Sequence, residues 1–387
     1  MVLGLCPKRK NHPLCGWIII DPNIVRGFKV DIEKEELWMK RLELPHRVAD
    51  YLCPINGLCD IYEWKTGERI PDQLLFSSKL GFQLISQKRA DSPKMVFWGN
   101  SSIGKREYEF WKNIIGYEIV SNGGKCFRTT WNEVKELLDR DIPTILFGLD
   151  MYFIPYQEKF YHTKHIPGHV VLMVGYDETQ VYVHDNSKIG VQTISVEDLR
   201  KAWANDYLGI SKRNTYFGID MKVLEKDISS IMQSGINKSA KMYLEPPLGF
   251  MGKRGLNKLT KEFPTWKNIF EKERLNKIYL HFIEYSGSTL PELPVKISGY
   301  DSGVINPHQA QRDKFADTFE KYADTIGNST WKEAAIFFRE SGKVIESINN
   351  DFIEDVMNQS FEEVEKYVWR FQTIKEKEEN AFKKLLG

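Results

Sequence analysis

The sequence has no long apolar run, almost no net charge and few cysteines. Its 387 residues carry a formal net charge of +1, so charge gives no reason to expect nucleic acid or an anionic membrane as a partner. No apolar run approaches the roughly 20 residues that a membrane-spanning helix needs. The N-terminal segment has no adequate apolar run before its basic residues, so no signal peptide is visible. We therefore expect a cytoplasmic protein.

Metal and disulfide frameworks are also missing from the cysteine pattern. The cysteines are odd in number and irregularly spaced: Cys6, Cys15, Cys53, Cys59 and Cys126. None forms a CxxC or Cys/His set with zinc spacing, and a cytosolic chain with free thiols is the natural interpretation. His162, His165 and His169 lie close together, but Pro167 favours a loop and no carboxylate pattern completes a site. We expect no metal.

The composition is that of a globular protein with two domains. Hydrophobic residues make up 42% of the chain and charged residues 28%, which is enough for a packed core. Before residue 222, strand-like runs such as 17–20, 94–98 and 144–147 alternate with helical ones, and from about residue 225 the pattern is helical. The change predicts one domain over 1–224 and a helical domain over 225–387.

The most informative segment predicts a β-hairpin with a histidine and an acid at the same end. His169 opens an apolar run, a polar turn follows at 175–178, and a second β-branched run at 181–183 leads to Asp185. In an antiparallel pair the start of the first strand lies beside the end of the second, so His169 and Asp185 should meet. A histidine held by an acid is half of a nucleophile–His–Asp site. The alternative is an ordinary hairpin with a polar tip.

A nucleophile is predicted at Cys53. Pro54 fits the first position of a helix, apolar residues between 58 and 62 repeat at helical spacing, and Gly67 ends the segment. Cys53 would then be the N-cap, where backbone amides, the helix dipole and a nearby imidazolium favour a thiolate. Cys59 lies almost two turns further along and is expected to be packed. Both cysteines could instead be small core residues.

A cysteine at a helix start, followed much later by a histidine and an acid on adjacent strands, is the arrangement of papain-like enzymes. On this basis the chain resembles the family of the butirosin-biosynthesis acyltransferase, with its papain-like, peptidase-C39-like N-terminal domain. The resemblance covers roughly residues 46–380. It differs at Leu52-Cys53-Pro54, where the family usually has His-Cys-Gly/Ser. The most specific matching stretches are 69–76, 151–156, 161–162, 168–169, 175–177, 182–185 and 196–203.

The resemblance implies an α+β papain-like fold with an all-helical C-terminal domain. It also implies acyl transfer from the pantetheinyl thioester of an acyl or peptidyl carrier protein to a small amine in natural-product biosynthesis, with no other cofactor. The catalytic residues would be Cys53, His169 and Asp185. The expected substrate-binding residues are Asn56, which follows the nucleophile, and three positions suggested by the family: Tyr152, His162 and Arg312.

Two other functions remain open from the sequence. A cysteine peptidase or amidase would use the same residues, because hydrolysis differs from transfer only in whether water reaches the acyl-enzyme. A non-catalytic binding protein could retain the fold.

The long Gly- and Pro-rich stretch 286–306 is predicted to cover the active-site cleft as a lid.

Overall fold

The computed structural model describes residues 39–49, 53–77, 79–99, 104–207, 211–222, 227–285 and 309–387. Residues 39–387 form one compact unit. The strand predicted at 17–20 and the lid predicted at 286–306 lie outside the described residues. Among the helices that are described, none is both long and apolar enough to cross a membrane.

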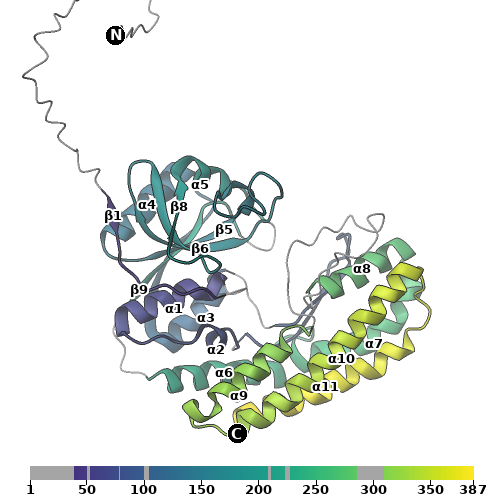
Figure 1. Cartoon of the computed structure of the whole chain (residues 1–387). Helices are drawn as coiled ribbons and strands as arrows, with labels where there is room; N and C mark the ends of the chain where they lie inside the picture. Colours follow the sequence, from purple (N-terminus) through teal and green to yellow (C-terminus); the bar gives the residue numbers. More distant parts are fainter. Residues whose placement is uncertain are drawn as a thin grey trace, which may run out of the picture. The chain divides into compact units, whose positions relative to one another are not determined.

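A seven-stranded antiparallel sheet forms the centre of the first half of this unit (Figure 1). The strands follow the order β4-β9-β5-β6-β7-β8, and β1 pairs with the far end of β6. The β6–β7 pair is the predicted hairpin. The strands are β1 (Lys40–Arg41), β4 (Tyr117–Asn122), β5 (Thr144–Leu149), β6 (His169–Tyr176), β7 (Gln180–His184), β8 (Val191–Ser195) and β9 (Thr215–Met221).

Helices cover both faces of this sheet, as Figure 1 shows. Alternate residues of β6 point to opposite faces, so Val170 and Leu172 join one apolar cluster while Val171 and Met173 join another. The first cluster lies beneath α1 (Cys53–Thr66) and α3 (Lys105–Trp111), which continues into a π-helical turn at Lys112–Gly116. The second lies beneath α4 (Phe127–Asp139) and α5 (Val196–Ala202).

The start of α4 differs from the sequence prediction. Thr130, with Glu133 three residues on, has the sequence pattern of an N-cap, but the helix begins at Phe127 and its N-cap is Cys126, with extended backbone. The amide of Thr130 donates to the carbonyl of Cys126, and its side chain is buried within the helix. Ser195 does cap α5, as its sequence predicts, because its hydroxyl accepts from the amide of Asp198 at 3.0 Å.

The chain after β9 is helical. Its helices are α6 (Ile228–Leu244), α7 (Gly252–Ile269), α8 (Lys272–Tyr285), α9 (Arg312–Ile326), α10 (Thr330–Asn358) and α11 (Glu365–Leu386). The sequence pattern around Pro264 predicts two separate helices, 253–262 and 264–286, and this prediction is wrong, because α7 continues through Pro264. Phe263 and Trp266 are both buried on either side of it, and their packing compensates for the backbone hydrogen bond that proline lacks.

A short helix, α2 (Asp72–Ser77), and a two-stranded hairpin of β2 (Gln83–Ser86) and β3 (Lys94–Phe97) precede β4 in sequence, and a 3-10 helix at Met151–Phe153 follows β5. The hairpin packs against α7 and α8 of the helical region. The architecture is therefore α+β, an antiparallel sheet with helices and a helical C-terminal region. The division at residue 224 stays a prediction.

Candidate active site

Helix α1 brings Cys53 to the end of β6 that carries His169. The helix begins at Cys53, so this residue is its first member rather than its cap. Gly57 allows the close approach of α1 to β6, because a Cβ there would lie 3.0 Å from the Cβ of Leu172. The start of the helix is also fixed by Tyr108, whose hydroxyl donates to the carbonyl of Pro54 at 2.9 Å.

His169 lies between Cys53 and Asp185. Its Nε2 donates to Oδ2 of Asp185 at 2.6 Å, which leaves Nδ1 as the nitrogen that can face the thiol. Burial alone would lower the pKa of His169. The charge and hydrogen bond of Asp185, together with those of Cys53, instead raise this pKa to about 10. The imidazole is therefore a cation at neutral pH and carries a proton on each ring nitrogen.

The Asp185 carboxylate is fully buried and held at both oxygens. Oδ2 also accepts from the hydroxyl of Tyr156 and the amide of Gln157, each at 3.1 Å. Oδ1 accepts from the backbone amide of Ser187 at 3.0 Å and from its hydroxyl at 2.8 Å. Burial would raise the pKa of Asp185, but the His169 cation and these donors hold it well below its usual range. The carboxylate is thus ionised and fixed in orientation.

A second buried network joins α1 to the backbone of Asp185. Asp60 lies on α1, and its Oδ2 accepts from Nδ1 of His46 at 2.7 Å and contacts Nδ1 of His184 at 3.1 Å. The other nitrogen of His46 donates to the carbonyls of Asp185 and Lys188 at 3.1 and 3.0 Å. The network therefore connects the helix that carries Cys53 with the strand end that carries Asp185.

His46, Asp60 and His184 also form the one group of potential metal ligands found within the described residues. However, the guanidinium of Arg69 donates to the second oxygen of Asp60 at 2.8 Å, so this carboxylate already has a cationic partner. Burial would lower the pKa of His46, but its hydrogen bond to Asp60 raises it, and a protonated His46 places a second cation there. We interpret the group as a structural ion network rather than as a metal site.

Two of the predicted substrate-binding residues are buried and bonded to protein groups. The Asn56 amide donates to Oδ2 of Asp72 and to the carbonyl of Arg47, both at 2.9 Å. Arg312 is fully buried and pairs with Glu378 at 2.7 Å. These hydrogen bonds connect segments of the protein. A role of Asn56 and Arg312 in substrate binding stays a prediction.

The other two predicted substrate-binding residues lie on the loop after β5. Tyr152 stacks on His165, with ring centroids 4.1 Å apart, and also contacts His162 at 5.3 Å. Asp150 anchors this loop through the backbone amide of Tyr152 at 3.1 Å and Nδ1 of His165 at 2.7 Å. The same loop supplies the Tyr156 contact to Asp185. A role of Tyr152 and His162 in substrate binding stays a prediction.

The other cysteines in the described part of the chain do not approach His169. Cys59 is fully buried in α1, and burial raises the pKa of its thiol. Cys126 is exposed beside α4, where a hydrogen bond from Thr129 lowers its pKa. Cys126 will therefore react with thiol reagents although it lies outside the site.

Several supporting residues carried no signal in the sequence. Tyr156, Gln157 and Ser187 orient Asp185 but lie in irregular segments without periodicity. His46 precedes the first helix, with only Pro45 beside it to indicate structure. Asp60 is the one supporting residue with a signal in the sequence, because a charged residue in the apolar stretch of α1 needs a buried partner.

These observations define the class: an α+β protein in which a cysteine at a helix start, a buried histidine and a buried aspartate meet at one end of an antiparallel sheet. Residues 52–186 match the family described as Butirosin biosynthesis protein H, N-terminal. This match covers about a third of the chain and agrees with the resemblance drawn from its sequence. Residues 197–286 match a domain of unknown function, DUF4872. No curated protein matches the chain.

The central sheet contains strands from both matched segments. The second segment contains β9, which lies between β4 and β5 and so completes the sheet begun by the first. Both matched segments therefore build the surroundings of Cys53, since Phe217 on β9 belongs to the apolar cluster beneath α1.

Proposed function

We propose that this protein is a cysteine-dependent acyltransferase of natural-product biosynthesis with a papain-like catalytic domain. It would move an acyl group from the thioester of an acyl or peptidyl carrier protein to a small amine, through an acyl-Cys53 intermediate. The observation that carries the proposal is the position of His169 between Cys53 and Asp185. The family description supports the biosynthetic setting.

The proposed reaction uses His169 twice. The Cys53 thiolate attacks the thioester carbonyl, and the carrier thiol leaves with the proton of the His169 imidazolium. The neutral imidazole then accepts a proton from the amine as its nitrogen attacks the acyl-Cys53 carbonyl. The C–S bond breaks, the amide is released, and the thiolate–imidazolium pair is restored. Asp185 would keep the imidazole in one orientation throughout both steps.

The covalent intermediate is the direct test. A small acyl thioester should add one acyl mass to the protein, measured on the intact chain, and Cys53→Ala should abolish the addition. The measurement belongs in a Cys126→Ala background, because the exposed Cys126 can also be acylated. Cys59→Ala is the matched control on the same helix. Peptide mapping separates any label on Cys6 or Cys15. If the Cys53→Ala variant is acylated as fully as the protein that retains Cys53, the proposal is wrong.

Transfer and hydrolysis are separated in the same assay. Acyl-Cys53 formed with a small thioester should persist in buffer and disappear faster when an amine acceptor is added, giving an amide. Release of free acid at a rate that does not depend on the amine would identify a hydrolase. A Cys53 that never loads, with any thioester or peptide, would identify a binding protein.

A further inference from the structure

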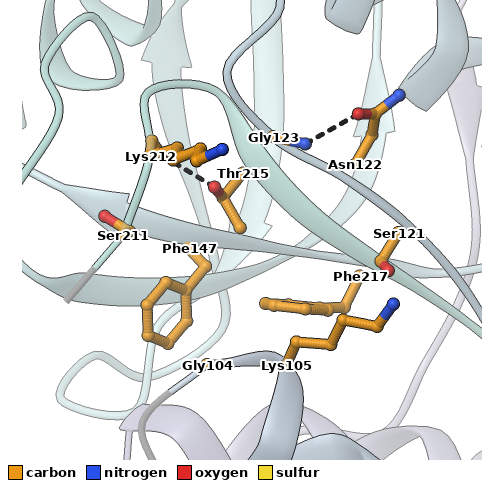
Figure 2. A pocket seen from close by; sticks show the side chains of 10 residues that line it. All are labelled: Gly104, Lys105, Ser121, Asn122, Gly123, Phe147, Ser211, Lys212, Thr215 and Phe217. Carbon is orange, nitrogen blue, oxygen red and sulfur yellow. Dashed lines mark hydrogen bonds between the residues drawn. The ribbon is translucent and has the colours of Figure 1, made fainter. Parts of the chain in front are cut away.

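A cavity of about 400 Å³ opens at one end of the central sheet (Figure 2). Its walls include the aromatic rings of Phe147 and Phe217, from neighbouring strands β5 and β9. The side chains of two lysines, Lys105 and Lys212, also line it, together with several hydroxyl and amide groups. The cavity thus combines an apolar wall with two ammonium groups.

The strand register places this cavity at the same end of the sheet as His169. Phe147 pairs with Val170, the residue after His169 on β6, and on its other side with Thr215 at the start of β9. Phe147 and Val170 both belong to the apolar cluster beneath α1. The cavity therefore shares one end and one face of the sheet with the helix that carries Cys53.

A single side chain, Tyr108, connects the cavity wall with the start of α1. Its ring packs on that of Phe217, with centroids 4.6 Å apart, and its hydroxyl donates to the carbonyl of Pro54 at 2.9 Å. Tyr108 is fully buried and interacts electrostatically with Cys53. A ligand in the cavity would thus lie one aromatic layer away from the nucleophile.

The two lysines of the cavity are exposed, and one hydroxyl beside them has no partner in the described part of the protein. Lys212 has no acidic partner among the described residues, and Lys105 has only a long, exposed contact of 3.6 Å to Glu109. The hydroxyl of Ser211 is buried without a hydrogen-bond partner in the described part of the chain. It lies over Gly148, where any Cβ would collide with it at 2.1 Å, so this strand residue has to be glycine. A buried hydroxyl without a partner calls for an explanation, and a ligand supplies one.

We propose that this cavity binds an anionic group of the acyl donor, joined to the thioester by an extended chain. The ammonium groups of Lys105 and Lys212 would pair with the anion, Ser211 would donate to it, and the methylene groups of the chain would lie on Phe147 and Phe217. This inference rests on the proposed acyl transfer and adds its substrate class. The anion is either a carboxylate on the acyl group or the phosphate of the pantetheine arm, and both share this chemistry.

The test compares three thioesters in the loading of Cys53. Propionyl-N-acetylcysteamine carries no anion, succinyl-N-acetylcysteamine carries a carboxylate on the acyl group, and propionyl-phosphopantetheine carries a phosphate on the thiol. We expect one anionic donor to reach half-maximal loading at roughly one tenth of the concentration that the neutral donor needs. The donor with this advantage identifies the source of the anion.

The Lys105→Gln/Lys212→Gln double variant should remove that advantage, so that the anionic donor loads Cys53 no better than the neutral donor does. Lys201→Gln is the matched control, because Lys201 is an exposed lysine on α5 that pairs with Glu197. The inference is overturned if neither anionic donor loads Cys53 at a lower concentration than the neutral donor. It is also overturned if the double variant retains that difference. In that case loading of Cys53 continues, and the proposed function stands.

Equilibrium binding tests the cavity without any chemistry. Titration calorimetry with phosphopantetheine and with succinate should show binding of one of them to the wild type and at least tenfold weaker binding to the double variant. The inference fails if neither compound binds, or if the wild type and the double variant bind them equally. Binding without any loading of Cys53 would instead retain the cavity and reject acyl transfer, so the two failures are distinct.

Discussion

Nε2 of His169 lies 2.6 Å from Oδ2 of Asp185, and both side chains are buried. Because Asp185 has further donors at both oxygens, it cannot rotate away from the imidazole. The pair therefore fixes which ring nitrogen faces Cys53. In the proposed mechanism this orientation matters as much as the charge, since the imidazole must deliver and accept a proton at one position.

The first prediction concerns this orientation. Asp185→Asn should slow the acylation of Cys53 by about 10²–10⁴-fold, because an amide can donate to the ring and stabilise the wrong tautomer. The rate is measured by intact mass over time with a small thioester. Ser187→Ala, which keeps the carboxylate but removes one of its donors, is the control and should cost about tenfold or less. A rate of Asp185→Asn within twofold of the wild type would contradict the role.

The second prediction is a pH dependence of stability. The pKa of Asp185 is lowered, so its contribution is present above the ordinary aspartate pKa of about 4 and is lost as pH falls through the lowered value. The pKa of His169 is raised to about 10, so its contribution is full below about pH 6.5 and is lost as pH rises through 10. Urea unfolding of the wild type and Asp185→Asn should therefore differ most between about pH 4 and 6.5.

That difference in the free energy of unfolding should reach about 3 kcal/mol near pH 6 and shrink toward pH 10. Glu197→Gln, which changes an exposed acid paired with Arg200, is a control that should show a small difference at every pH. A gap between the wild type and Asp185→Asn that widens with rising pH would show that the ion pair does not stabilise the fold.

The third prediction concerns the contact between α1 and β6. Gly57→Val should push the helix away from Leu172, destabilise the fold by about 1–3 kcal/mol and slow acylation, because Cys53 moves with the helix. Leu172→Ala in the same chain keeps the Cβ at 3.0 Å but removes the γ-carbon at 3.7 Å, so it should restore only part of both losses. The measurement is a double-mutant cycle on unfolding and on acylation rate. Strict additivity of the two substitutions would argue against a direct contact.

The hairpin and the helix of Cys53 could be predicted because their signals are local. His169 and Asp185 are joined by one short turn, and the helix start is indicated by adjacent residues. The groups that orient the site are not local. His46 and the Asp185 carbonyl are 139 positions apart, and Gln157 lies 28 positions from Asp185. Such contacts depend on how the sheet and loops fold, and no spacing rule predicts them.

The same reasoning explains the prediction about Arg312. An arginine near a helix start, matched by resemblance, was expected to bind substrate. The fold instead places it inside, where its guanidinium donates to the carbonyls of Gly81 and Trp98, both at 2.9 Å. These carbonyls flank the β2–β3 hairpin, and the ion pair to Glu378 completes the contacts. Only the packing of distant segments brings these partners to the arginine.

The last prediction separates these two roles of Arg312. Arg312→Ala leaves Glu378 as a buried charge without its partner, so the free energy of unfolding should fall by about 3–5 kcal/mol. Arg312→Met with Glu378→Met replaces both charges by apolar groups and should recover most of that loss. In the folded double variant, the thioester concentration for half-maximal loading of Cys53 should match the wild type. If the double variant recovers its stability but needs a much higher thioester concentration for half-maximal loading, Arg312 contributes to substrate binding.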